Sequence, residues 1–270
     1  MSRFSIAEIK REVLNRGIVA SIGETTIWRW LSEDAIRPWR HRSWIFPRAP
    51  DFSEKAGRIL DLYEGVWEGK PLGPRDYVVS ADEKTSIQAR KRLHPTLPPV
   101  PGLPIYVEHE YERKGAWAYL AAWDVRRAKV FGRCERTTGI APFRRLVRQV
   151  MSQPPYRGAR RVFWVIDNGS SHRGQRCVER LTKAWPNIVV VHTPVHASWL
   201  NQVEIYFSIV ERKVLTPNDF NSLTQLRDRL LRFQEHYEQA ARPFRWKFTR
   251  ADLQELLAKV SAKEDHDKAA

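Results

Sequence analysis

A short apolar run that ends in an acidic residue constrains the fold of this chain more than any other stretch. The run is Val162–Ile166, and Asp167 follows it together with the small polar residues Asn168–Ser171. Consecutive apolar and aromatic residues of this length are typical of a strand buried on both faces, which needs a layer of structure on either side. The carboxylate that follows either caps a turn or is held beyond the sheet for chemistry.

The segments around this strand indicate a layered α/β fold. Three segments with strand character precede the first helical one after residue 75, and strands and helices alternate from there. A mixture of this kind predicts a sheet with helices packed on it. The predicted strands cover residues 76–89, 115–125, 128–136, 161–166 and 187–194, and the predicted helices cover 141–153, 173–185, 198–215, 222–240 and 249–263. The proline-rich residues 93–104 carry too few apolar side chains to belong to the core.

The first part of the chain indicates a small helical unit. Ser5 and Glu8 form a capping-box pattern, and a second such pattern, Ser21–Glu24, opens the segment TTIWRWLSE. Two short helices joined by a turn containing Gly17 are typical of a helix-turn-helix, whose second helix enters the major groove of DNA. The alternative is a helical hairpin that packs on the main domain.

Threonine and arginine side chains in and after the second helix are the candidates for DNA contact. In the segment RPWRHRSWIF, arginines alternate with tryptophans, a combination that suits contacts to phosphates and stacking on the DNA backbone. In the helical-hairpin alternative, Trp28 and Trp30 are ordinary core residues. The candidates are Thr25, Thr26, Arg29, Arg37, Arg40 and Arg42.

These patterns predict three regions along the chain. Residues 1–46 form a helix-turn-helix domain, residues 47–74 form a linker with a bridging helix, and residues 75–270 form the α/β domain with C-terminal helices. Prolines at 47 and 50 and the segment KPLGPRD mark the two boundaries.

Charge and composition favour a nucleic-acid partner. The chain has 46 Lys and Arg against 31 Asp and Glu, a formal net charge of +15. A balance this basic favours a polyanion, of which nucleic acid is the commonest. The sequence contains no apolar run of the ~20 residues that span a bilayer, and its start lacks the apolar region of a signal peptide. We therefore expect a soluble cytoplasmic protein with no membrane association.

Three acidic residues are the candidate catalytic groups. Asp82 follows a short apolar strand, as Asp167 does, and Glu204 lies at the edge of a helical apolar stripe that Ser198 would cap. The stripe consists of Leu200, Val203, Phe207, Val210 and Val214. Catalytic groups of α/β sheets gather beyond strand ends, and converging carboxylates can hold Mg²⁺, which prefers oxygen ligands.

The sequence motifs around these acids resemble those of one family. The segments SADEKTSIQAR, WVIDNGSSH and HTPVHASWLNQVEIYFS are similar to those of the DDE transposases, and more narrowly to the bacterial insertion-sequence branch of the mariner-like superfamily, the IS-six-thirty family. The separations of 85 residues from Asp82 to Asp167 and 37 from there to Glu204 also fit. The resemblance covers residues 75–257, and residues 5–46 resemble the family's DNA-binding helices.

The resemblance implies a fold, an activity and partners. The fold would be an RNase H-like catalytic domain preceded by a helix-turn-helix domain. Asp82, Asp167 and Glu204 would hold Mg²⁺ or Mn²⁺, as two ions, for hydrolysis at the ends of an insertion sequence and transfer of the freed 3′-OH into target DNA at a TA step. The partners would be the terminal inverted repeats, target DNA and a second copy of the chain, in a bacterial cytoplasm at the nucleoid.

Neighbouring polar residues are expected to support the three acids. Each has an ordinary alternative that the sequence leaves open, such as capping a turn, starting a solvated helix or forming polar surface. The candidates for positioning the acids or contacting phosphate are Asn168, His172, His196, Asn201 and Gln202.

Other readings of the sequence remain or are excluded. The chain has room for one helix-turn-helix where relatives of this family usually carry two, so one alternative is a catalytically inactive or truncated copy that acts as a DNA-binding repressor. Another is an RNase H-like nuclease or resolvase without strand transfer. No P-loop, dinucleotide fingerprint or G-x-S-x-G motif is present. Asp124, a further strand-end acid, is expected to close a hairpin.

Overall fold

The structure divides the chain into two units, which are described separately. The computed structural model describes residues 5–33, 49–169 and 174–269, and the units are Met1–Phe46 and Pro47–Ala270. Of the predicted site residues, Arg37, Arg40, Arg42 and His172 lie outside the described residues.

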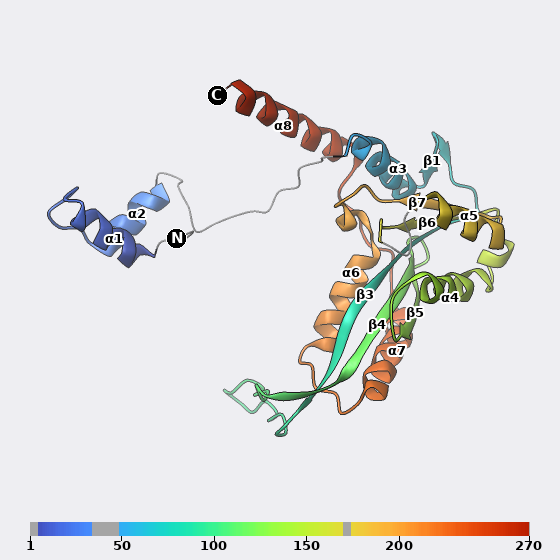
Figure 1. Cartoon of the computed structure of the whole chain (residues 1–270), viewed down its shortest axis with the longest axis horizontal. Coiled ribbons are helices and arrows are strands. Elements are labelled where there is room, and N and C mark those ends of the chain that lie inside the picture. Colours follow the sequence, from blue (N-terminus) through green and yellow to red (C-terminus); the bar gives the residue numbers. More distant parts are fainter. Residues whose placement is uncertain (1–4, 34–48, 170–173, 270) are drawn as a thin grey trace. The chain divides into compact units, whose positions relative to one another are not determined.

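The first unit contains two short helices, α1 (Ile6–Asn15) and α2 (Glu24–Glu33) (Figure 1). The capping box of Ser5 and Glu8 is formed in both directions. The capping box predicted at Ser21 is wrong, because α2 begins only at Glu24, and the backbone N–H groups of Thr26 and Ile27 donate to the carbonyl of Gly23. Trp28 and Trp30 are about half exposed, so within this unit they are surface rather than core residues.

A five-stranded mixed sheet is the centre of the second unit. Its strands lie in the order β5-β4-β3-β6-β7, in which β4 is antiparallel to both of its neighbours, β3 and β5, and β6 and β7 run parallel to β3. Their bounds are β3 (Asp76–Arg92), β4 (Tyr111–Asp124), β5 (Lys129–Glu135), β6 (Arg161–Ile166) and β7 (Ile188–His192). A small hairpin of β1 (Val66–Trp67) and β2 (Lys70–Pro71) precedes the sheet.

Helices cover both faces of this sheet, as the apolar run of β6 predicts (Figure 1). Val162, Trp164 and Ile166 enter the core beneath α4 and α5, whereas Phe163 and Val165 enter the core that includes α3, α6 and α7. The helices are α3 (Phe52–Glu64), α4 (Ile140–Met151), α5 (Gln175–Ala184), α6 (Val203–Val210), α7 (Leu223–Ala240) and α8 (Arg250–Ala269). The predicted α/β layering is therefore confirmed, and none of the described helices is long and apolar enough to cross a membrane.

The predicted helix 198–215 is broken into three parts. A 3-10 turn, η2 (Ser198–Leu200), comes first, α6 follows, and a π-helical turn, η3 (Glu211–Leu215), ends the segment. The expectation that Ser198 caps the helix is wrong, because α6 begins at Val203 and its N-cap position is Gln202. The apolar stripe of this segment is nevertheless buried throughout.

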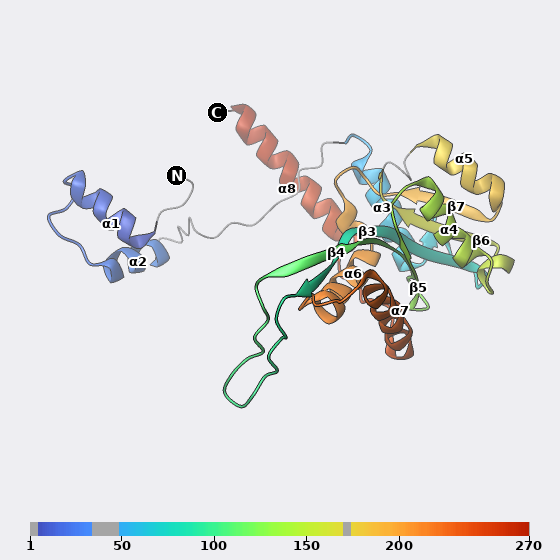
Figure 2. The same ribbon diagram turned by 60° about the horizontal axis from the view of Figure 1, so that its bottom comes forward.

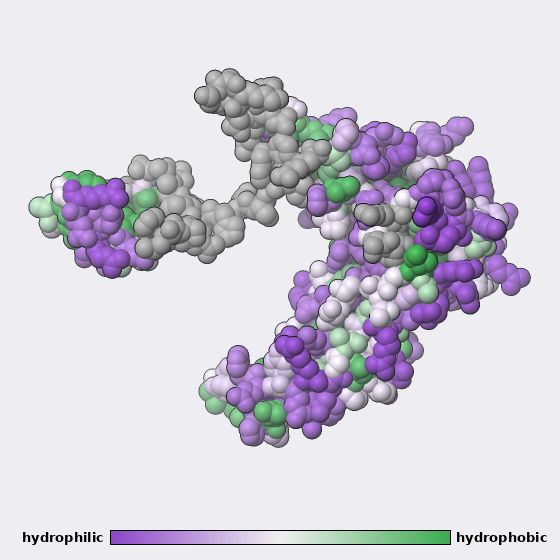
Figure 3. All heavy atoms as spheres, viewed as in Figure 1, coloured by the Kyte–Doolittle hydropathy of each residue, from purple (hydrophilic) through white to green (hydrophobic). Residues whose placement is uncertain are grey.

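The strands β3 and β4 continue beyond the rest of the sheet as a two-stranded ribbon. β6 pairs with β3 only as far as Ser80, and β5 pairs with β4 only from Ala118. Figure 2 shows the proline-rich connection extending from the far end of this ribbon, and Figure 3 shows apolar residues on its surface. Leu97, Val100 and Leu103 are more than half exposed, which confirms that this excursion is not core.

Close packing between strand and helix requires a glycine at position 132 of β5. A Cβ built there would overlap the hydroxyl of Tyr119 and approach Oε1 of Gln234 to 2.5 Å. Gly132→Ala should therefore lower the free energy of unfolding by about 1–3 kcal/mol, measured by urea denaturation. Gly158→Ala is the matched control, since a Cβ there meets no atom within 4 Å. Equal losses in the two variants would contradict this reading of the packing.

Candidate active site

The three candidate acids lie on three separate elements of the second unit. Asp82 is on β3, Asp167 follows the last residue of β6, and Glu204 is in the first turn of α6. Asp82 lies within β3, as the predicted strand 76–89 has it, and not after the end of a short strand, because β3 continues past it to Arg92 as half of the ribbon.

Parallel pairing between β3 and β6 sets the two aspartates level with each other. The last pair in the ladder is Ser80 with Val165, and the same register continued by two residues places Asp82 beside Asp167. Neighbouring strands are about 4.8 Å apart, so the two carboxylates lie within electrostatic reach. Because side chains alternate along a strand, both acids share the parity of Val165, which faces the core that includes α6.

A buried serine ties the helix of Glu204 to the strand of Asp82. The Oγ of Ser80 accepts a hydrogen bond of 2.9 Å from the backbone N–H of Val203, the first residue of α6. The first backbone N–H groups of a helix have no acceptor inside the helix, so Ser80 provides the acceptor for one of them. Glu204 is the next residue, and its position relative to Asp82 is thereby fixed.

The acids influence one another's ionisation. The pKa of Asp82 is raised to about 7, first by burial and then by the charges of Asp167, Glu204 and Glu83, whereas a hydrogen bond from the backbone N–H of Glu83 opposes the rise. The pKa of Glu204 is also raised, chiefly by burial and further by Asp167, against the nearby charge of Lys84. Carboxylates whose charges act on a neighbouring carboxyl in this way are close enough to share a counter-ion.

The donor set fits a hard divalent cation. It offers carboxylate oxygens and no thiolate, and Mg²⁺ and Mn²⁺ prefer such oxygens. In the described part of the chain, no three His, Cys, Asp or Glu side chains are already grouped tightly enough to hold an ion. Mutual repulsion of like charges keeps such groups apart in the absence of a cation, and a bound cation would relieve it.

Asn201 connects all parts of this arrangement. Its side-chain amide donates to the carbonyl of Ala81 at 2.9 Å and to Oδ2 of Asp82 at 3.3 Å, and its Oδ1 accepts from the hydroxyl of Ser80. The side chain is fully buried, so each of these bonds is made away from water. Of the two parts that the sequence analysis leaves open for Asn201, positioning an acid or contacting phosphate, its hydrogen bond to Asp82 favours the first.

Sequence reasoning missed two residues of this network. Ser80 is detectable in principle, because it is a hydroxyl inside an apolar strand at the same parity as Asp82. No comparable sequence pattern distinguishes Tyr63 of α3. Its hydroxyl donates to the carbonyl of Leu200 at 2.7 Å and accepts from the backbone N–H of Gln202 at 3.4 Å, which anchors the turn before α6.

The other polar candidates are distributed around this centre. Asn168 donates its side-chain amide to the carbonyl of Thr193, so it joins the ends of β6 and β7. Asp167 accepts the backbone N–H of Gly169 at 2.8 Å, so it also caps the turn. Gln202 is buried, and its Oε1 is without a hydrogen-bond partner among the described residues. His196 is exposed and has a backbone φ of 61°.

The DNA-binding candidates that are described lie on the helix α2. Thr25 and Arg29 are exposed, and Thr26 is partly buried. Ile27 is buried at 4% exposure, whereas Trp28 and Trp30 are about half exposed, so the surface of α2 carries both polar and aromatic side chains.

Two further buried acids are accounted for by structure. Asp124 accepts backbone N–H groups of Arg126 and Arg127 and the hydroxyl of Tyr156, which confirms that it closes the β4–β5 hairpin. Asp76 forms a two-pronged ion pair with Arg161. Neither carboxylate is left to join the three candidate acids.

Comparison with known proteins agrees with this geometry. The sequence model of a family described as DDE superfamily endonuclease matches residues 77–227, which contain all three acids. No curated protein sequence matches the chain.

Among solved structures, several of the Mos1 mariner transposase are similar to this chain. The paired end complex with Mn is 14% identical with a TM-score of 0.54, covering 96% of this chain and 73% of that one. The pre-cleavage transpososome is 15% identical with a TM-score of 0.53, covering 97% and 79%. The strand transfer complex is 13% identical with a TM-score of 0.51, covering 97% and 77%. At these identities the likeness concerns the fold, and it confirms the predicted RNase H-like α/β domain preceded by helices.

The hydroxyl of Tyr63 should contribute measurably to stability. Tyr63→Phe keeps the ring and leaves the carbonyl of Leu200 without its donor, so the free energy of unfolding should fall by about 1–3 kcal/mol. The measurement is urea denaturation followed by circular dichroism. Tyr106→Phe, at a half-exposed ring, is the control and should change little. A loss no larger than in this control would mean that the anchor is not formed.

The raised pKa of Asp82 predicts a pH-dependent stability in metal-free protein. A carboxyl whose pKa is about 7 when folded and 3.8 when unfolded stabilises the fold only while protonated, so stability falls as pH rises through this interval. Asp82→Asn removes that loss. In EDTA, the melting temperature of this variant relative to wild type should therefore be clearly higher at pH 8 than at pH 5.

A second aspartate provides the matched control for this pH test. The pKa of Asp76 is lowered, first by the hydrogen bonds from Arg161. Its stabilising contribution is present above its unfolded pKa and is lost only as pH falls through its lower folded value. Asp76→Asn should therefore destabilise the protein equally at pH 5 and pH 8. The same pH-independent change in Asp82→Asn would show that its carboxyl titrates normally.

Proposed function

Because the chain belongs to the DDE superfamily endonucleases, we propose that it is a DNA transposase whose catalytic acids are Asp82, Asp167 and Glu204. The observation that carries the proposal is that three carboxylates from distant parts of the sequence lie at one edge of the sheet, inside the segment that defines the family. The charge of Asp167 raises the pKa of both Asp82 and Glu204, and the charge of Glu204 also raises the pKa of Asp82.

The chemistry proposed is phosphoryl transfer in two steps. Water first attacks the phosphodiester at the end of the element, which breaks the bond to the 3′ oxygen and frees a 3′-OH. That hydroxyl then attacks a phosphodiester of the target, so one bond to phosphorus forms as another breaks. Two divalent cations held by the acids would activate the attacking oxygen and stabilise the leaving one. The protein supplies positioning and charge, with no covalent enzyme intermediate.

The residues of this chain have distinct parts in that proposal. The carboxylates of Asp82, Asp167 and Glu204 would hold Mg²⁺ or Mn²⁺, and Asn201 would keep Asp82 oriented. Solved structures of similar fold that are described as complexes with Mn or Mg support this choice of cation. Asn168, His172, His196 and Gln202 would line the path of the scissile phosphate or support the acids.

The partners proposed are DNA and a second copy of the chain. The similar Mos1 structures are described as paired end and strand transfer complexes, which supports binding of two element ends by a dimer. The net charge of +15 supports the same class of partner. The finer proposal is an insertion-sequence transposase of the IS-six-thirty branch, which recognises its terminal inverted repeats and inserts at TA.

Recognition of the element ends is proposed for the N-terminal region. Residues 1–46 would be the helix-turn-helix domain, and residues 47–74 would connect it to the catalytic domain 75–270. The exposure of Thr25 and Arg29 on α2 supports its use as the recognition helix. Thr26 and the basic residues Arg37, Arg40 and Arg42 would add contacts to bases or phosphates.

Cleavage of element-end DNA tests the catalytic proposal. Duplexes carrying the inverted repeats that flank the coding frame should be nicked by wild type in Mg²⁺ or Mn²⁺. Asp167→Asn should lower the nicking rate by at least about a hundredfold, since loss of a metal ligand exceeds the effect of an outer residue. The products are resolved on denaturing gels.

A neighbouring acid provides the control for this experiment. Glu83→Gln removes one charge next to Asp82 from a side chain that alternation places on the other face of β3. It should retain nicking within a few-fold of wild type. DNA binding without nicking by wild type would support the alternative of a non-catalytic DNA-binding protein, and equal nicking by Asp167→Asn would overturn the assignment of the acids.

A further inference from the structure

A polar groove of about 260 Å³ runs beside β3, next to the candidate acids. β6 leaves this edge of β3 at Ser80, and the groove follows the edge from there toward the ribbon. Its walls are polar almost throughout. The lining includes Lys84, Ser86, Gln88, Arg90, Glu211 and Asn218.

A β-bulge shapes the wall of the groove. Lys84 pairs with Tyr119 and Ile87 pairs with Trp117, so Thr85 and Ser86 together face a single residue of β4. Ser86 has a φ of 54°, and both bulged residues are exposed. A bulge re-aims side chains and is frequent beside active sites. Here it presents two hydroxyls toward the groove.

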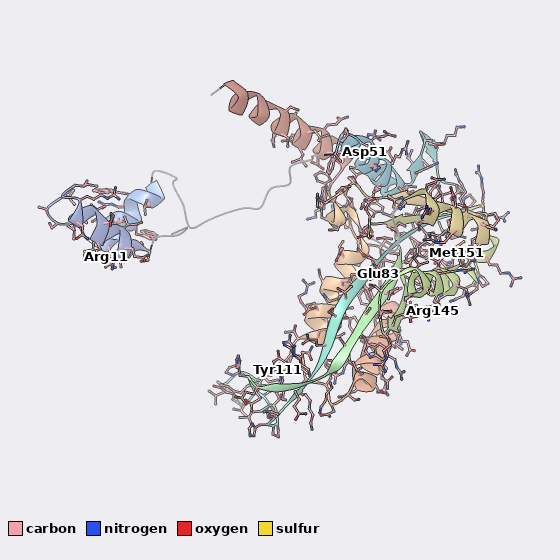
Figure 4. The ribbon with its side chains drawn as sticks, in the orientation of Figure 1. Arg11, Asp51, Glu83, Tyr111, Arg145 and Met151 are labelled. Atoms are coloured by element: carbon pink, nitrogen blue, oxygen red, sulfur yellow. The ribbon has the colours of Figure 1, made fainter. Side chains whose placement is uncertain are left out.

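Arg90 is held in place with a donor unused. Its guanidinium lies 4.7 Å from the centre of the Tyr111 ring, and its backbone N–H donates to Oδ1 of Asn218 at 3.1 Å. Its Nε is buried and makes no hydrogen bond to any described residue. Figure 4 shows Tyr111 on the ribbon and Glu83 at the sheet end of the same strand pair. Because the Nε is closed to solvent, an anion would be bound by the terminal Nη groups of this guanidinium, which its stacking on Tyr111 holds in place.

Lys84 links this groove to the candidate active site. It lies two residues after Asp82 on β3, its ammonium is 3.0 Å from Oε2 of Glu211, and its charge opposes the rise in the pKa of Glu204. One end of the groove is therefore beside a candidate catalytic acid. From Lys84 to Arg90 the strand extends about 20 Å, at about 3.3 Å per residue.

The charges favour an anionic ligand over a cation. The groove contains two basic side chains, Lys84 and Arg90, against one acidic side chain, Glu211, which Lys84 already pairs. Gln88 Oε1 is also without a partner among the described residues. It is an acceptor, so water rather than a phosphate oxygen would satisfy it.

We propose that this groove binds the sugar–phosphate backbone of the DNA strand next to the bond that is cut, with the Arg90 guanidinium donating to a phosphate. The inference rests on the proposed transposase function and adds where the strand leaves the active site. Lys84 and the hydroxyls of the bulge provide the contacts between Arg90 and the acids. The groove thus orients the strand before the acids act on it.

The salt dependence of DNA binding tests the contact at Arg90. The full chain is titrated into a fluorescent duplex of about 30 base pairs carrying an element end, over a series of KCl concentrations. Arg90→Gln should weaken binding on the order of fivefold and lower the slope of log affinity against log salt by about 1, as loss of one phosphate contact does. Its melting temperature is measured alongside.

Lys91→Gln is the matched control. Lys91 is the next residue of β3, is exposed, and does not line the groove. This variant removes the same charge from a side chain that points to the other face. Its affinity for the duplex should therefore stay within about twofold of wild type, and its salt slope should equal that of wild type within experimental error. Equal effects at the two positions would mean diffuse attraction and would overturn the proposal.

Lysine footprinting of wild type gives a readout that needs no variant. Acetylation is quantified by mass spectrometry with and without the same duplex. DNA should protect Lys84 and leave Lys91 reactive; protection of neither or of both equally would overturn the groove. If wild type neither binds nor nicks the duplex, the proposed function itself fails. If it nicks while Arg90→Gln behaves as Lys91→Gln, only the groove assignment fails.

Discussion

The parallel ladder between β3 and β6 is the constraint on which the candidate site depends. It sets Asp82 and Asp167 at the same height on neighbouring strands. If the register shifted, no change of side-chain rotamer could bring the two carboxylates level again. A shift by one residue would turn Asp82 toward the opposite core. The tightly packed apolar residues of β6, on both faces of the sheet, are therefore what keep two like charges side by side.

Holding these charges together costs stability, and buried polar bonds offset the cost. Ser80 and Asn201 connect β3, the acid on it and the start of α6 in a network closed to water. A polar network of this kind is favourable only when its members are satisfied, so it specifies one arrangement of the three elements. The position of Glu204 is thus a property of the core, and the same core sets how strongly the acids repel.

The sequence was sufficient to predict the layering of the fold and to select three acids as catalytic candidates, and it was insufficient to predict what holds these acids in place. Strand character and family motifs depend on residues close together in the sequence, so the strand β6 and the candidates Asp82, Asp167 and Glu204 can be identified from the sequence. The length of β3 depends on its pairing with β4, and the start of α6 depends on Ser80, which is distant in sequence. Tyr63 escaped notice because a single hydroxyl bonded to a distant backbone leaves no periodicity or motif.

The place of α3 in the fold has a consequence for defining the catalytic unit. The segment shared with the family begins at residue 77, yet α3 ends at Glu64 and contributes Phe52, Ile59 and Leu60 to the core beneath α6, together with the Tyr63 anchor. A fragment cut at the family boundary would expose that core and release the turn before Glu204. The sequence shared with the family therefore leaves out residues that pack against α6 and hold the turn before Glu204.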